Sequence, residues 1–106
     1  MEINSAYWGA RAREYRALAK DCPAAEVRQI WSYLAVRCLE LATTPANEAM
    51  PPDMRRDETA AHWRAREDTY RLKAAREASP EVRAAWAALA SCCNKIAHDL
   101  EDASRS

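Results

Sequence analysis

The chain has 106 residues, of which 49% are apolar and 30% charged, as in a single globular domain rather than a disordered chain. Its 16 basic and 16 acidic residues balance, so net charge provides no general attraction to nucleic acid or to an anionic membrane. One glycine, no phenylalanine and abundant alanine, leucine, arginine and glutamate favour helices over strands.

The first half of the chain predicts two helices. The first covers about residues 5–21, and its apolar stripe is Trp8, Ala12, Tyr15 and Ala19. Pro23 marks the start of the second, about residues 24–43, because a proline in the first turn loses no helical hydrogen bond. Its apolar positions are Val27, Trp31, Leu34, Cys38 and Leu41, spaced 4, 3, 4 and 3 residues apart. That spacing places all of them on one helical face, as a bundle core requires.

The second half follows a proline-rich linker, about residues 44–53, and predicts two more helices. The third covers about residues 54–78, with Asp53 as a candidate N-cap. The fourth covers about residues 80–102, with Ser79 as its N-cap and a proline in its first turn. Its apolar positions are Val82, Trp86, Leu89, Cys93 and Ile96, again spaced 4, 3, 4 and 3.

The two halves align without a gap at a shift of 55 residues. The identical pairs include Trp8–Trp63, Arg11–Arg66, Tyr15–Tyr70, Trp31–Trp86, Leu34–Leu89 and Cys38–Cys93. Such a match indicates an internal duplication within a single domain of residues 1–106. The first repeat is then about residues 5–43 and the second about residues 54–102.

Each repeat is a helical hairpin that cannot bury its own apolar face, whereas two hairpins can cover each other. The sequence therefore predicts an all-α, antiparallel four-helix bundle with Trp31 and Trp86 buried. We favour an up-down-up-down order of helices. A linker of ten residues could extend to roughly 33 Å, which also allows a crossover past a helix of about 27 Å.

The cysteines and histidines are weak candidates for chemistry. Cys38 and Cys93 lie on the apolar stripes, so we expect both thiols to be buried hydrophobic groups. In the favoured order their helices lie diagonally, well beyond the Cα separation of about 7 Å that a disulfide allows. No cysteine pair has CxxC spacing. His62 and His98 could meet at one end of the bundle as a surface metal site, but two exposed histidines are the favoured interpretation, and we predict neither metal nor cofactor.

An aromatic and basic rim is the best candidate for partner binding. Its residues are Tyr7, Trp8, Arg11, His62, Trp63 and Arg66. At this spacing an arginine can cover an aromatic ring, and both residue types are frequent anchors of protein interfaces. The favoured interpretation is a packed amphipathic rim, and the alternative is a groove for a partner or ligand.

Residues 62–97 resemble short, uncharacterised helical proteins of alphaproteobacteria that carry an HWR-x-RA-x-E-x-R segment, a (D/S)-P-E turn and an A-x-x-Y-x-x-LA helix. The matching residues are His62, Trp63, Arg64, Arg66, Pro80, Glu81, Leu89, Ala90, Ile96 and Ala97. The chain departs from this pattern at the aromatic position of the second helix, which is Cys38 or Cys93 here. The resemblance implies a small bacterial helical-hairpin protein of the cytoplasm, and it brings no activity or site residues with it.

The sequence has no nucleophile–base arrangement, phosphate loop or dinucleotide fingerprint, so we expect no enzyme activity. It has no apolar run of the ~20 residues that a membrane span needs and no signal-peptide pattern, so we expect a cytoplasmic protein. Our hypothesis is a non-enzymatic bundle that acts through protein–protein contacts, as an adaptor or a homo-oligomer. The alternative is a bundle that binds a small molecule or a metal. Binding to nucleic acid is not expected, because basic residues alternate with acidic ones.

Overall fold

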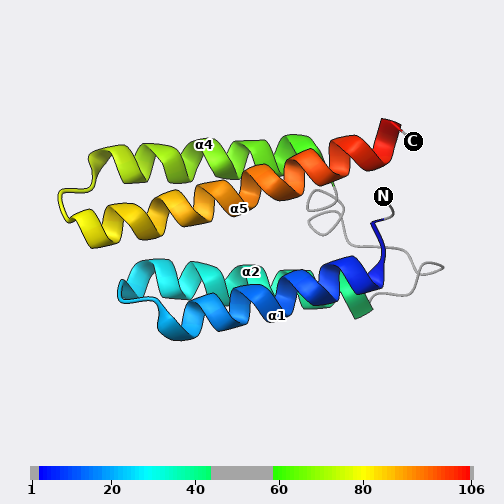
Figure 1. Ribbon diagram of the computed structural model, residues 1–106, viewed down its shortest axis with the longest axis horizontal. Helices are drawn as coiled ribbons and strands as arrows, with labels where there is room; N and C mark the ends of the chain where they lie inside the picture. The colour runs from blue at the N-terminus through cyan, green and yellow to red at the C-terminus, as the bar shows by residue number, and fades with distance from the viewer. Residues whose placement is uncertain (1–2, 44–58, 106) are drawn as a thin grey trace.

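The structure is a computed structural model and describes residues 3–43 and 59–105. Within these residues the secondary structure is entirely helical, as predicted (Figure 1). The helices are α1 (Ser5–Asp21), α2 (Ala25–Thr43), α4 (Ala60–Arg76) and α5 (Pro80–Arg105). The predicted linker and the candidate cap Asp53 lie outside the described residues. The predicted bounds of α1 and α2 agree with the structure to within one residue.

Short polar side chains fix where the helices begin. Asn4 caps α1, because its Oδ1 accepts a hydrogen bond from the backbone N–H of Tyr7 at 3.1 Å. Thr59 caps α4 in the same way. Ser79 caps α5 as predicted, by accepting from the N–H of Val82 at 3.4 Å. The predicted end of the third helix at residue 78 is two residues too late, because Glu77 already has an extended backbone with φ −84° and ψ 128°.

The four helices form two hairpins that lie side by side. α1 packs along α2 and α4 packs along α5, and each pair is joined by a turn of three residues. Figure 1 shows both turns at the same end of the molecule, with α4 beginning near the end at which α2 stops. Between the hairpins, α2 and α5 make the most extensive close approach.

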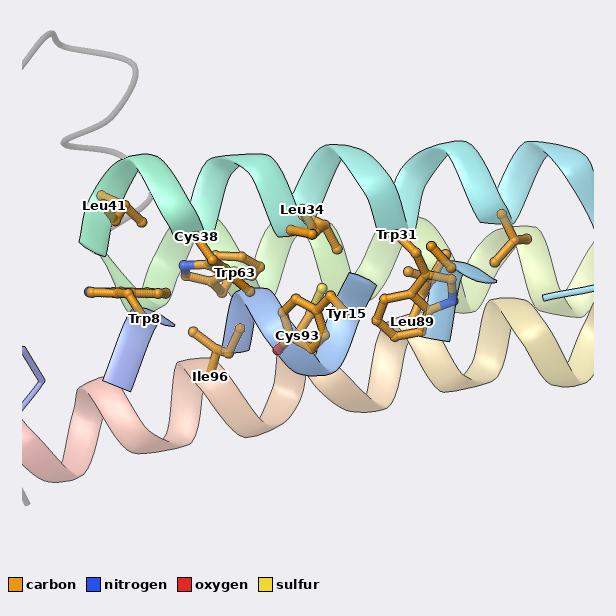
Figure 2. Packing of buried hydrophobic residues seen from close by; sticks show 14 of the residues in the cluster. Trp8, Tyr15, Trp31, Leu34, Cys38, Leu41, Trp63, Leu89, Cys93 and Ile96 are labelled. Atoms are coloured by element: carbon orange, nitrogen blue, oxygen red, sulfur yellow. The ribbon is translucent and has the colours of Figure 1, made fainter. Parts of the chain in front are cut away.

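The predicted apolar faces form the core between the hairpins (Figure 2). Trp31 and Trp86 are only 2% and 3% exposed, which confirms their predicted burial. Every predicted apolar position of α2 is buried, and in α5 only Val82 is half-buried. The hydrophobic effect of this shared face therefore holds the two hairpins together.

The approach of α2 to α5 is closer than the sequence predicted. Several Cα atoms of the two helices lie within 8 Å of each other. Cys38 and Cys93 are nevertheless not joined by a disulfide.

Candidate functional site

The predicted rim is built around a pair of stacked tryptophans, one from the first turns of α1 and one from those of α4. The rings of Trp8 and Trp63 have centroids 6.2 Å apart and planes inclined by 24°. Both rings are buried, and Figure 2 shows them inside the core beside Cys38 and Ile96. The ring of Tyr7 meets Trp8 edge-on at 5.2 Å. The stack therefore joins the two hairpins from within.

The two arginines of the rim cover aromatic rings. The guanidinium of Arg11 lies 5.4 Å from the centre of the Tyr7 ring. The guanidinium of Arg66 lies 4.5 Å from the Trp63 ring and 5.9 Å from the ring of Tyr33 on α2. Each contact is a cation–π interaction. The structure thus brings together five of the six predicted rim residues, and it places both tryptophans where a partner could reach them only if the hairpins separated.

The hydroxyl of Tyr7 anchors α1 to α5. It donates a hydrogen bond of 2.8 Å to Oδ2 of Asp99, a buried carboxylate that also lies 4.0 Å from Nζ of Lys95. Burial raises the pKa of Tyr7, and the hydrogen bond to Asp99 and the negative charge of Asp99 raise it further. The phenol therefore stays protonated at neutral pH and acts as a structural donor.

We expect Tyr7→Phe to lower the free energy of unfolding by about 1–2 kcal/mol, because it leaves a buried carboxylate oxygen without its donor. Chemical denaturation followed by circular dichroism would measure the change. Tyr33→Phe is the matched control, since the Tyr33 hydroxyl accepts only an exposed hydrogen bond of 3.3 Å from Arg37. A Tyr7→Phe variant as stable as that control would show that the buried bond contributes nothing.

The two histidines occupy different environments. His62 is half-buried in the first turn of α4, and its backbone N–H donates to Oγ1 of Thr59 at 3.3 Å. His98 is exposed, and its Nε2 lies 3.4 Å from Oδ2 of Asp102 one turn further along α5. Over residues 3–43 and 59–105, no three or more His, Cys, Asp or Glu side chains form a group that could hold a metal ion.

A polar cluster around one buried carboxylate, inside the second hairpin, was not predicted from the sequence. The carboxylate of Glu67 is 6% exposed and accepts hydrogen bonds from Nε and Nη2 of Arg71, at 3.0 and 2.6 Å. It also accepts from Nδ2 of Asn94 on α5, at 3.1 and 3.3 Å. Arg64 extends the cluster by pairing with Glu67 and, at 2.6 Å, with Glu101. We call these five residues the Glu67 cluster.

The Glu67 cluster has no counterpart in the first hairpin. A shift of 55 residues places Glu67 on Ala12 and Asn94 on Leu39, both apolar. The acidic Glu67 in the apolar stripe of α4 was therefore the sequence signal that could have revealed the Glu67 cluster. Burial alone would raise the pKa of Glu67, but the hydrogen bonds from Arg71 and Asn94 and the charge of Arg71 outweigh it, so the pKa is lowered.

A groove of about 260 Å³ opens near the turn end of the second hairpin. It lies between α2, α4 and α5, and its lining includes Glu26, Leu72, Lys73, Arg76, Glu77 and Trp86. Beside the Trp86 ring, the lining holds two cations, Lys73 and Arg76, and two carboxylates, Glu26 and Glu77. The sequence analysis did not single out this site, because its residues come from three helices.

The outer side of α2 carries exposed apolar side chains. Tyr33, Val36 and Leu39 are 49%, 52% and 42% exposed. They follow one another at intervals of three residues, so they form a ridge that winds across the helix surface. We call these three residues the α2 ridge.

The thiols are placed for packing rather than reactivity. Burial raises the pKa of Cys93 to about 12 and that of Cys92 to about 11. Cys38 is fully buried, whereas Cys22 is partly exposed in the turn between α1 and α2. A thiol must ionise to act as a nucleophile, so these environments disfavour attack by the core cysteines.

We expect iodoacetamide to modify Cys22 first in the folded protein and to modify Cys38 and Cys93 only as the protein unfolds. Mass spectrometry of samples quenched over time would follow each residue. In urea all four cysteines should react at similar rates. Equal rates for Cys22 and Cys93 in the folded protein would contradict the burial of the core thiols.

A scan against protein-family models, a search of curated proteins and a search of solved structures each found no match to the chain. In the described part of the chain, none of the helices is both long and apolar enough to cross a membrane.

Proposed function

We propose that this protein is a non-enzymatic helical bundle that acts through protein–protein contacts, as an adaptor or by self-association. The observation that carries the proposal is the α2 ridge of Tyr33, Val36 and Leu39, each between 42% and 52% exposed. Single exposed apolar residues are common on soluble proteins. Three large ones in consecutive positions of one ridge favour a surface that another protein covers.

Comparison of the two repeats supports this assignment. The positions of α5 that match the α2 ridge are Ala88, Ser91 and Asn94, which are small or polar. The equivalent helices α2 and α5 would thus share their buried sides and differ at these three positions. A difference of this kind is expected where one copy has acquired a contact surface.

The proposal includes a duplicated, antiparallel up-down-up-down bundle as the scaffold. Equivalent ring pairs support the duplication, because Tyr15–Trp31 and Tyr70–Trp86 have centroids 5.3 and 5.9 Å apart and planes inclined by 41° and 36°. The stack of the equivalent residues Trp8 and Trp63 fits a pseudo-twofold axis that passes between them. In such a scaffold the inner faces of the helices form the core, so only the outer faces are accessible to partners.

We also propose a cytoplasmic location. The structure joins none of the four cysteines in a disulfide, and two of them are fully buried; a reducing compartment maintains this state.

Val36→Arg tests the proposed function, because Val36 lies in the middle of the α2 ridge and a charge there opposes the burial of the surface. Ser91→Arg is the matched control at the equivalent exposed position of α5. We expect the parent protein and Ser91→Arg to self-associate in light scattering or to retain the same protein in affinity capture. Val36→Arg should lose that association while keeping its helical circular dichroism. Association that is unchanged by Val36→Arg, or a strict monomer that retains no protein, would contradict the proposal.

A further inference from the structure

The contact between the two hairpins has the form of a twofold interface between subunits. A shift of 55 residues places α1 on α4 and α2 on α5. Across the interface, α1 reaches α5 through the hydrogen bond from Tyr7 to Asp99. Reciprocally, α4 reaches α2 through Lys73 and Glu26, whose charged atoms lie 3.9 Å apart. Reciprocal contacts are typical of twofold dimers, in which residue i meets residue j and j meets i.

The tryptophan stack lies where the axis of such an interface would pass. In a twofold dimer, a residue on the axis meets its own copy. Trp8 likewise meets its equivalent Trp63, and the centroids of the two rings lie 6.2 Å apart. These contacts do not depend on whether the two hairpins belong to one chain. The inner face of a hairpin therefore fits a hairpin of a second copy as well as it fits its own.

Each hairpin is held together internally, so it would exchange as a unit. A turn of three residues joins the two helices of each hairpin and keeps them antiparallel neighbours. Inside the second hairpin, Asn94 on α5 donates to Glu67 on α4 at 3.1 Å. Arg64 on α4 pairs with Glu101 on α5 at 2.6 Å. The two hairpins are connected through residues 44–58, which lie outside the described residues.

The balance between pairing within one chain and pairing between chains depends on concentration. Exchange keeps the contacts between the hairpins, so the apolar face is buried equally in both arrangements. The covalent connection gives a hairpin an effective concentration on the order of 1 mM for its own partner. Pairing within one chain then dominates at micromolar concentrations, and pairing between chains competes near millimolar. Exchange of folded protein is slow, because it requires the buried tryptophan faces to separate.

We propose that two copies of this chain exchange hairpins, so that the first hairpin of each packs on the second hairpin of the other. The dimer then holds two four-helix units with the contacts described above. Exchange of an identical element is a low-cost route to a dimer. This inference rests on the proposed function, because it names a second copy of this chain as the partner, but it uses the inner faces of the hairpins rather than the α2 ridge.

Refolding a mixture of isotope-labelled and unlabelled full-length chains tests the inference. Equal amounts are unfolded together in urea and refolded at about 1 mM and, separately, at about 1 µM. A carbodiimide then joins Lys73 to Glu26 by an amide bond, and mass spectrometry identifies the crosslinked peptides. We expect monomer at the lower concentration and a dimer fraction at the higher one. In that dimer, about half of the Glu26–Lys73 crosslinks should join a labelled peptide to an unlabelled one.

Lys95 and Asp99 provide the control, because they lie 4.0 Å apart within α5 and their crosslink should carry a single isotope in every sample. Monomer at both concentrations would overturn the inference. A dimer whose Glu26–Lys73 crosslinks all carry one isotope would also overturn it, since such a dimer forms through outer surfaces.

Val36→Arg separates this inference from the proposed function. Val36 is 52% exposed on the outer side of α2, so the variant should lose association through the α2 ridge. It should still give mixed-isotope crosslinks after refolding at about 1 mM, because the inner faces are unchanged. Loss of the mixed crosslinks in a folded Val36→Arg variant would contradict exchange through the inner faces.

Discussion

Replacing Trp63 by alanine should lower the free energy of unfolding by about 3–5 kcal/mol, the usual cost of truncating a buried tryptophan. The Trp63 ring is fully buried, stacks on Trp8 at 6.2 Å and is covered by the guanidinium of Arg66 at 4.5 Å. Its removal would open a cavity at the point where α1 of one hairpin meets α4 of the other. A domain of this size has a total stability of about 5–15 kcal/mol, so this loss is a large fraction of it.

Urea denaturation followed by circular dichroism would measure the loss. Trp63→Phe keeps part of the stacking and of the buried volume, so it should be less destabilised. Its free energy of unfolding can be measured even if Trp63→Ala does not fold. The double variant of Trp8→Ala and Trp63→Ala should lose less than the sum of the two single changes, because both remove the same stack. Strictly additive losses would show that the two rings stabilise the fold independently.

The burial of the Trp31 and Trp86 faces could be predicted from the sequence, because a 4–3 spacing of apolar residues fixes the inward side of a helix. The stack of Trp8 on Trp63 could not. Periodicity says which side of each helix turns inward, but it does not say which residues of two different hairpins meet there. That register depends on how the complete apolar faces of the two hairpins interlock.

The candidate site shows the same limit. Five of the six rim residues lie together in the structure, but the sequence did not show that the rings of Trp8 and Trp63 stack on each other. It also missed Glu67 and Asn94, which lie 27 residues apart and become neighbours only when α4 packs on α5. A polar residue in an apolar stripe looks like a defect in the pattern until its partner on another helix is known.

Replacing Glu67 by glutamine should lower the free energy of unfolding by about 1.5–3 kcal/mol near neutral pH, the range for buried hydrogen bonds to a charged group. Glutamine has the same size but loses the charge that Arg71 and Asn94 stabilise. Asp68→Asn, an equal charge change at the exposed neighbouring position, is the control and should change stability by less than about 0.5 kcal/mol.

The effect of Glu67→Gln should also depend on pH, because the folded protein holds the pKa of Glu67 below its usual range. An unfolded glutamate has a pKa of about 4.3. A carboxylate with a lowered folded pKa contributes its full stability above the unfolded pKa and loses it as the pH falls through the folded pKa. The difference between the parent and Glu67→Gln should therefore be constant from about pH 7 to pH 5 and should shrink below about pH 4. A difference that grows on acidification would contradict the assigned direction of the pKa shift.

The first hairpin provides the sharpest test of what the Glu67 cluster does, because it shows the same scaffold with apolar residues in these places. Glu67→Ala alone leaves the Asn94 amide without its acceptor, and Asn94→Leu alone removes a donor from a buried carboxylate, so each single change should be destabilising. The double variant recreates the Ala12 and Leu39 combination and should recover much of the combined loss, since replacing a buried polar group together with its partner by apolar groups is often neutral. Recovery would mean that the cluster determines the register in which α4 and α5 pack and adds little to the free energy of unfolding. If the double variant instead lost the sum of both single effects, the cluster would be a net source of stability. The first hairpin has no such source.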